Sequence, residues 1–162
     1  MDVSPDIRLG VPSDMDAMMS LAMMATEENA FMPPSIQKMA LMIWGALTRQ
    51  NGLVGIITDE PDKAQGAVLL TIGETWYSDH KMIEERAIFI HPEYRTAKAG
   101  LGKRLCQFSK RIADELEMPL IIGVLSNQRT QGKIRMYQRE FGEQAGAFFL
   151  YGARTGAATP SD

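Results

Sequence analysis

The sequence has a single cysteine, Cys106, in its 162 residues. One thiol cannot form a bridge within the chain, so a secreted fold held together by disulfides is excluded. The first residues, from Met1 to Asp6, carry neither the basic stretch nor the apolar run of a signal peptide. We therefore expect a reducing, cytoplasmic location.

Long apolar runs are also missing. The longest, such as 67–72 and 119–125, have the length of strands and fall well short of the ~20 residues that cross a bilayer. Positive charge is not in excess either, because 17 Lys and Arg stand against 20 Asp and Glu, for a net charge of −3. A surface that binds nucleic acid needs more basic than acidic side chains. Both a membrane and a nucleic acid are therefore disfavoured as partners.

Several catalytic signatures are absent. His80 and His91 have no cysteine or carboxylate at metal-ligand spacing, so no metal site is expected. The chain has no Gly-x-Ser-x-Gly nucleophile turn, and Gly100-Leu-Gly102 lacks the Gly-Lys-Ser/Thr ending of a nucleotide triphosphate loop. Cys106 lies among apolar residues of a predicted helix, which favours a buried, inert thiol.

Hydrophobic periodicity predicts an α/β fold. Spacings of three and four predict helices and short apolar runs predict strands, in the order β-α-α-β-β-β-α-β-α-β, with helices on both faces of a mixed sheet. A single domain is expected over 1–152, followed by a mobile tail over 153–162. The predicted strands cover 6–9, 53–58, 64–72, 82–90, 120–125 and 147–151, and the predicted helices cover 13–28, 35–47, 101–116 and 130–141.

The segment Ile88–Leu105 is the most informative part of the chain. It runs from an apolar strand through a basic turn with two glycines into an amphipathic helix. The first amides of a helix have no partner within it, and the helix dipole adds positive charge there, so such a turn suits an anion such as a pyrophosphate. An ordinary connection with solvated basic residues has the same appearance. The basic side chains around the turn are Arg95, Lys98, Lys103 and Arg104.

This segment resembles the GNAT superfamily of acyl-CoA-dependent N-acetyltransferases. The family has a strand followed by Arg/Gln-x-x-Gly-x-Gly/Ala at the start of a helix, and Arg95-Thr-Ala-Lys98-Ala-Gly100 fills that frame with Lys98 at the usual first glycine. A second alignment uses Gly100-Leu-Gly102 as the glycine pair and lengthens the turn by two residues. Both alignments stay open.

A second region carries the same resemblance. The predicted strand 120–125 is followed by Ser126-Asn127 and then by a helix with Tyr137-Gln-Arg139-Glu-Phe141-Gly142. The family has an Asn and then Tyr-x-Lys/Arg-x-Gly-Phe in this place, so here the last pair is inverted. The resemblance covers the chain from Ile7 to about Tyr151. It implies that the strands before Arg95 and from Leu120 are parallel neighbours that splay apart.

The resemblance also implies acetyl-CoA as a co-substrate and a set of site residues. In the family, the tyrosine at the place of Tyr137 gives a proton to the leaving thiolate. Many members use a glutamate of the preceding strand as general base, and counting back six residues from Ile90 gives Glu84. Strand alternation places Glu84 on the face of Ile88 and Ile90 and turns Glu85 to the other, unless a bulge reverses them. The implied cofactor contacts are Ile88, Ile90, Arg95, Lys98, Ala99, Gly100, Leu101, Gly102, Lys103 and Asn127.

The expected function is transfer of an acetyl group from acetyl-CoA to a primary amine of a small molecule or a peptide. One alternative is a catalytically inactive GNAT-like protein that binds acyl-CoA or a partner. Another is a toxin that acetylates aminoacyl-tRNA, which the acidic balance disfavours. The sequence around Ser126 and Tyr137 also resembles acetyltransferase-like proteins of phage and prophage genomes. The acceptor amine, the size of the acyl group and a homodimer are left open.

Overall fold

A computed structural model describes residues 7–60, 62–96, 99–126 and 129–153 of the chain. It has the predicted α/β fold with a mixed sheet, and its elements follow the predicted order as far as the last helix. Their bounds are β1 (Ile7–Leu9), α1 (Met15–Asn29), α2 (Ile36–Leu47), β2 (Gly52–Ile57), β3 (Gly66–Glu74), β4 (Lys81–Ile90), α3 (Leu101–Leu116), β5 (Leu120–Ile121) and α4 (Thr130–Phe141), with 3₁₀ turns at Pro12–Asp14 and Pro92–Tyr94.

The five strands form one sheet in the order β1-β2-β3-β4-β5. Neighbours from β1 to β4 are antiparallel, whereas β4 and β5 are parallel. The parallel pairing ends at Glu84 and Ile121, although β4 continues to Ile90. The two strands therefore part beyond this point, as the family resemblance predicts.

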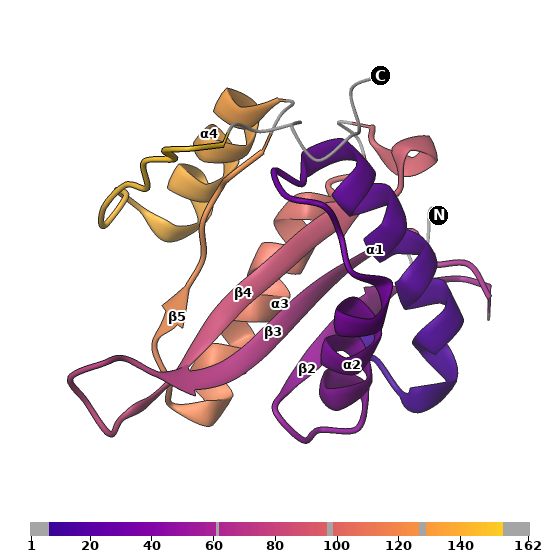
Figure 1. Cartoon of the computed structure of the whole chain (residues 1–162), viewed down its shortest axis with the longest axis horizontal. Helices are drawn as coiled ribbons and strands as arrows, with labels where there is room; N and C mark the ends of the chain where they lie inside the picture. The colour runs from indigo at the N-terminus through magenta and orange to yellow at the C-terminus, as the bar shows by residue number, and fades with distance from the viewer. Residues whose placement is uncertain (1–6, 61, 97–98, 127–128, 154–162) are drawn as a thin grey trace.

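Helices cover both faces of the sheet. In Figure 1, α1 and α2 lie in front of the sheet and α3 lies behind it. Each face has its own apolar core, because side chains alternate along the strands. The core under α1 and α2 includes Met18, Leu21, Ile43, Leu47, Val54, Ile56 and Phe89. The core under α3 includes Val68, Leu70, Ile83, Leu101, Leu105, Phe108 and Ile112.

Polar side chains fix where the first two helices begin. Ser35 Oγ accepts a hydrogen bond from Lys38 N at 3.2 Å, which caps α2. Asp14 precedes α1 and is almost fully buried, yet it accepts from Val11 N at 2.8 Å and from both Arg8 nitrogens at 2.7 and 2.8 Å. These bonds fasten β1 to the start of α1 and hold the pKa of Asp14 below its ordinary value, chiefly through the hydrogen bond from Arg8.

Two predicted strands differ from the structure. β5 ends at Ile121, whereas the apolar run predicts a strand to Leu125. The predicted last strand, 147–151, is irregular, and Phe148, Phe149 and Tyr151 are 85%, 94% and 100% exposed. An apolar run becomes a strand only where a neighbour accepts its hydrogen bonds, and composition does not reveal that neighbour. The predicted tail lies outside the described residues from 154 onward.

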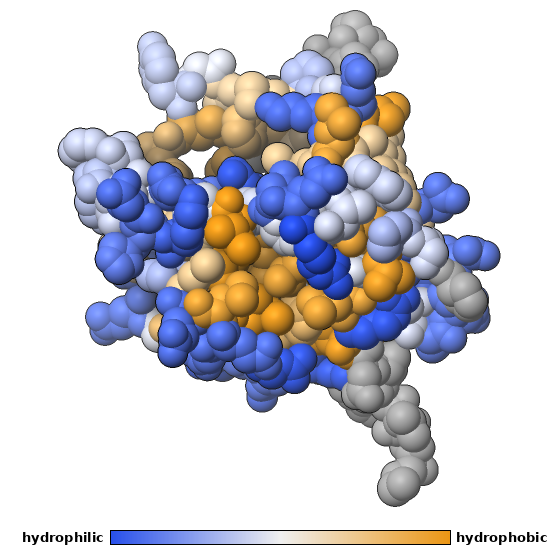
Figure 2. Space-filling view, turned by 90° about the horizontal axis from the view of Figure 1, so that it is seen from below, coloured by the Kyte–Doolittle hydropathy of each residue, from blue (hydrophilic) through white to orange (hydrophobic). Residues whose placement is uncertain are grey.

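The surface is polar with apolar areas. Figure 2 shows one such area, ringed by hydrophilic side chains, on the face seen from below. Among the described residues, no helix has both the length and the apolar character needed to span a membrane. The same residues bring together no group of three or more His, Cys, Asp or Glu that could hold a metal ion.

Candidate functional site

A cleft of about 490 Å³ opens between the end of β4, the start of α3 and one side of α4. It unites many of the residues that the sequence singles out, although they come from separate elements. The predicted residues that line it are Ile88, Ile90, Arg95, Gly100, Leu101, Gly102, Lys103 and Tyr137. Further lining residues are Phe89, Tyr94, Thr96, Arg129, Gly132, Lys133, Met136 and Arg139.

The start of α3 presents backbone amides to this cleft. Gly100 takes a left-handed conformation with φ +58°, which suits glycine, and α3 begins at the next residue. The hydrogen bond from Arg104 N to Gly100 O, at 3.1 Å, closes the first turn of the helix. The amides of 101–103 precede that bond and lie at the positive end of the helix dipole. This is the geometry of an anion site.

The second glycine of the turn has a packing role. A Cβ built on Gly102 would lie 2.9 Å from Met136 Sδ, so a larger residue would require the Met136 side chain of α4 to shift. Gly100 and Gly102 thus stand on either side of the helix start, and because Gly100 belongs to both alignments, its conformation is compatible with either. Lys98, the key residue of the first alignment, lies outside the described residues.

Arg95 lines the cleft, but its guanidinium is engaged elsewhere. Its two terminal nitrogens donate to the Glu28 carboxylate at 2.9 and 2.6 Å, and its Nε donates to Ile90 O at 2.8 Å. The hydrogen bonds from Arg95 hold the pKa of Glu28 below its ordinary value. Arg95 therefore ties α1 to the end of β4. The other cationic side chains on the wall of the cleft are Lys103, Arg129, Lys133 and Arg139.

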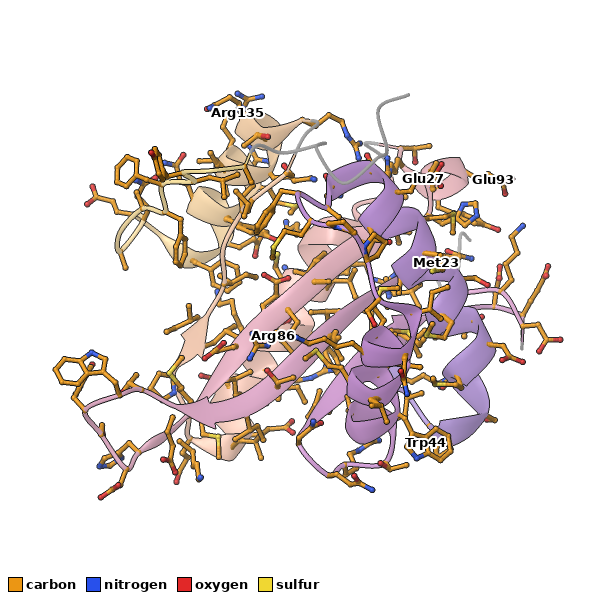
Figure 3. The ribbon with its side chains drawn as sticks, viewed as in Figure 1. Met23, Glu27, Trp44, Arg86, Glu93 and Arg135 are labelled. Carbon is orange, nitrogen blue, oxygen red and sulfur yellow. The ribbon has the colours of Figure 1, made fainter. Side chains whose placement is uncertain are left out.

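One side of α4 forms the wall opposite β4. The lining residues of α4 recur at intervals of three and four, as expected for one face of a helix: Arg129, Gly132, Lys133, Met136 and Tyr137. This spacing is visible in the sequence, but composition alone does not identify these residues as part of a site. The pKa of Lys133 is lowered, and burial of its side chain is the largest cause. Figure 3 shows Arg135 on the outward side of α4, and it is not part of the lining.

The predicted contacts at Ala99 and Asn127 have different outcomes. Ala99 N donates to both the carbonyl and the Oγ1 of Thr96, each at 3.2 Å, and the residue packs against the core under α3. Its amide is therefore used within the turn, and Ala99 does not line the cleft. Asn127 lies outside the described residues.

The strand parity predicted for the two glutamates is wrong. Leu70 lies opposite Glu85 and Leu69 lies opposite Ala87, so β4 holds an additional residue, Arg86, at a bulge. The bulge reverses the alternation between Glu84 and Ile88. As a result, Glu85 shares the α3 face with Ile88 and Ile90, and Glu84 lies on the face of α1 and α2.

Glu84 also has a partner on its own face. Arg86 binds the Glu84 carboxylate at 3.2 Å, and its Nε donates to Thr71 Oγ1 at 2.9 Å. Figure 3 shows Arg86 beside β3 and β4. Glu84 is therefore an ion-paired residue on the sheet face opposite to Ile88 and Ile90, and neither Glu84 nor Glu85 is among the residues that line the cleft.

Glu85 and Tyr137 have perturbed proton affinities. Burial raises the pKa of Glu85 to about 7, opposed by a long hydrogen bond from Gly123 N at 3.5 Å. Burial also raises the pKa of the Tyr137 hydroxyl, and the negative charge of Glu85 adds to this rise. At neutral pH, Tyr137 therefore keeps its proton, and Glu85 holds a proton more readily than an ordinary glutamate does. Such paired shifts are typical of acid and base groups in active sites.

Comparison with known proteins identifies the fold that contains this cleft. The sequence matches no protein-family model and no curated protein. Solved structures do resemble it, among them an integron cassette protein from the mobile metagenome of Cole Harbour Salt Marsh (TM-score 0.68, 20% identity, 91% of this chain and 90% of that chain). An aminoglycoside acetyltransferase from an uncultured soil metagenomic sample, in complex with sisomicin, gives a TM-score of 0.68 at 15% identity over 93% and 97%.

A third structure is AAC(6')-Iy in complex with the bisubstrate analogue CoA-S-monomethyl-acetylneamine, with a TM-score of 0.67 at 16% identity over 90% and 95%. The chain has the GNAT acetyltransferase fold. In this GNAT fold, β4 and β5 part after their short parallel pairing, and the cleft follows the free end of β4 from Ile88 to Ile90.

Proposed function

We propose that this protein is an acyl-CoA-dependent N-acetyltransferase that acts on a primary amine of a small molecule or a peptide. The observation that carries the proposal is one continuous cleft with helix-start amides at one end and Tyr137 on its wall. Similarity to solved acetyltransferases supports it, including one in complex with an aminoglycoside and one with a CoA bisubstrate analogue.

The residues present fit acetyl-CoA. Amides of 101–103 at the start of α3 suit a pyrophosphate, and Lys103 and Arg129 add positive charge beside them. The free edge of β4 at Ile88–Ile90 offers backbone groups to the amides of a pantetheine arm, because β5 has already separated from it. When bound, acetyl-CoA supplies the thioester whose acyl group is transferred.

Transfer needs one proton removed and one proton supplied. The amine nitrogen bonds to the thioester carbonyl carbon, the carbon–sulfur bond breaks, the nitrogen loses a proton and the sulfur gains one. Tyr137 is the proposed donor to sulfur, because its raised pKa keeps the hydroxyl protonated at neutral pH, so that it holds a proton to donate as the thiolate departs. Glu85 replaces Glu84 as the proposed acceptor of the amine proton, directly or through a water, since a pKa of about 7 suits a general base at neutral pH.

The proposal is tested by acetyl-CoA-dependent thiol release with a panel of amines. The panel holds sisomicin, a linear polyamine, a peptide with a free N-terminus and an aminoacyl-tRNA. Cys106 is buried and its pKa is raised to about 12, so the protein itself contributes little thiol signal. Thiol release with at least one amine, lost in Tyr137→Phe and kept in the exposed control Tyr77→Phe, is the expected result.

Binding is measured in parallel by the thermal shift with CoA. A thermal shift with CoA but no turnover with any amine would mean that the protein binds CoA without catalysing transfer. Turnover with aminoacyl-tRNA alone would mean that the acceptor is the amine of an aminoacyl-tRNA and not that of a small molecule or a peptide. The absence of both shift and turnover would overturn the proposal.

A further inference from the structure

The cleft contains an amine of the protein itself, on Lys133. This residue lines the cleft from α4, and its side chain is half-buried. Lys133 lies four residues before Tyr137, so the two side chains are neighbours on one face of the helix, with roughly 5–6 Å between their Cβ atoms. The flexible four-carbon stem of a lysine covers a distance of that size. The Lys133 amine can therefore reach the space next to the Tyr137 hydroxyl.

Lys133 differs from the lysines that form surface ion pairs. Lys63 Nζ lies 3.3 Å from Glu93 Oε2, and Lys81 Nζ lies 2.5 Å from Glu74 Oε1. Within the described parts of the chain, no carboxylate stands at such a distance from the Lys133 amine. The nitrogen is therefore available to a molecule that enters the cleft.

Positive charge surrounds this amine instead. Burial is the largest cause of the lowered pKa of Lys133, and the charges of Arg129 and Arg95 lower it further. The charge of Glu28 acts in the opposite direction, but both terminal nitrogens of Arg95 already bind that carboxylate, at 2.9 and 2.6 Å. A desolvated lysine next to other cations loses its proton more easily than a solvated one, and the neutral amine is the nucleophile.

The proposed proton acceptor and proton donor surround the same amine. Glu85 does not line the cleft, but its charge acts on both Lys133 and Tyr137. The three groups that acetyl transfer needs in the protein and its acceptor, an amine, a base and an acid, thus lie around one part of the cleft.

We propose that Lys133 is itself an acceptor, which the protein acetylates when acetyl-CoA is bound and no other amine occupies the cleft. The Lys133 nitrogen bonds to the carbonyl carbon of the thioester, and the carbon–sulfur bond breaks. The nitrogen loses one proton to Glu85, directly or through a water, and the departing thiolate gains one from Tyr137. The products are acetylated Lys133 and free CoA. The inference rests on the proposed acetyl transfer in the same cleft.

This modification changes the cleft. Acetylation removes a positive charge from the wall and adds a group beside Tyr137. The acetylated chain has less room for a second acyl group, so it should turn over more slowly than the unmodified chain. The modification therefore links activity to the supply of the acceptor amine.

The test is the site and extent of acetylation when the full chain is incubated with acetyl-CoA and no added amine. Mass spectrometry of the intact protein should show a gain of one acetyl group for each chain. Trypsin does not cleave after an acetylated lysine, so the modified protein should give the peptide 130–135 in place of 130–133 and 134–135.

Matched variants separate Lys133 from other lysines. Lys133→Arg keeps the positive charge and should lose the modification, and its thermal shift with CoA checks that the cleft is intact. Lys103→Arg changes another lysine of the cleft wall and should still be acetylated at Lys133. Added CoA should slow the acetylation of Lys133 and leave that of the exposed Lys38 unchanged, because only acetyl-CoA bound in the cleft serves Lys133.

The parent chain decides the proposal. A thermal shift with CoA but no acetylation at Lys133 overturns this inference and leaves the proposed function intact, whereas the absence of any shift and any acetylation overturns both. Equal acetylation of Lys133 and Lys38 also overturns the inference, because that is the pattern of a reaction from solvent. A rate constant that rises with protein concentration contradicts it too, since one copy would then acetylate another.

Discussion

Replacing Glu85 by glutamine should stabilise the protein at neutral and basic pH. The bulge at Arg86 turns Glu85 into the interior on the α3 face, where burial raises its pKa to about 7 from the ordinary 4.5. A carboxyl whose pKa is higher in the folded state favours folding below pH 4.5, where it is protonated in both states. That advantage is lost as the pH rises through about 7, because the folded state must then hold a buried charge.

The size of the effect follows from the two pKa values. At about 1.4 kcal/mol for each pKa unit, the difference between 4.5 and about 7 corresponds to about 3 kcal/mol. Glutamine keeps the shape and has no charge to bury. Glu85→Gln should therefore match the parent below pH 4.5 and exceed its free energy of unfolding by up to about 3 kcal/mol above pH 8.

Urea denaturation of parent and variant between about pH 4 and pH 9 measures this difference. Glu84→Gln is the matched control, because its carboxylate is ion-paired with Arg86 on the opposite face and should show no such gain. A gain in Glu84→Gln, or a pH-independent difference in Glu85→Gln, would refute the placement of Glu85 by the bulge.

Three further changes probe the cleft. Tyr137→Phe should lower kcat by roughly 10²-fold while the Kd for CoA stays near that of the parent, measured by thiol release and calorimetry; equal turnover would leave Tyr137 a structural residue. Gly100→Val places a β-branched residue at φ +58° and should weaken CoA binding by about 10-fold, or about 1.4 kcal/mol; an unchanged Kd would contradict the anion site. Glu28→Gln removes the ion-pair partner of the half-buried Arg95 and should lower the free energy of unfolding by roughly 3 kcal/mol, measured by urea denaturation at pH 7. Because the pKa of Glu28 is lowered, that difference should shrink as the pH falls below the ordinary 4.5, and a constant difference would argue against the ion pair.

The sequence predicts those features of the fold that local spacing determines. The apolar residues of α3 recur at helical spacing, and the helix forms over Leu101–Leu116 as expected. The predicted range of the last helix, 130–141, is also that of α4. Strand alternation, by contrast, fails at Arg86, because a bulge depends on how β4 pairs with β3 and not on the residues of β4 alone.

Partners distant in sequence explain the remaining differences. Arg95 has the appearance of a phosphate ligand, yet it pairs with Glu28, 67 residues earlier in the chain, and no local pattern reveals that contact. The same holds for 147–151, whose apolar run predicts a strand but carries no information on which edge would accept it. In both places the outcome depends on tertiary contacts.

A crystal structure of the chain with bound CoA tests the central claim most directly. The account predicts pyrophosphate oxygens at about 3 Å from the amides of 101–103 at the start of α3, with the sulfur next to the Tyr137 hydroxyl and Glu85 on the same side of the sheet. CoA bound away from the α3 start, or a sulfur that approaches Glu84 on the opposite face, would contradict it.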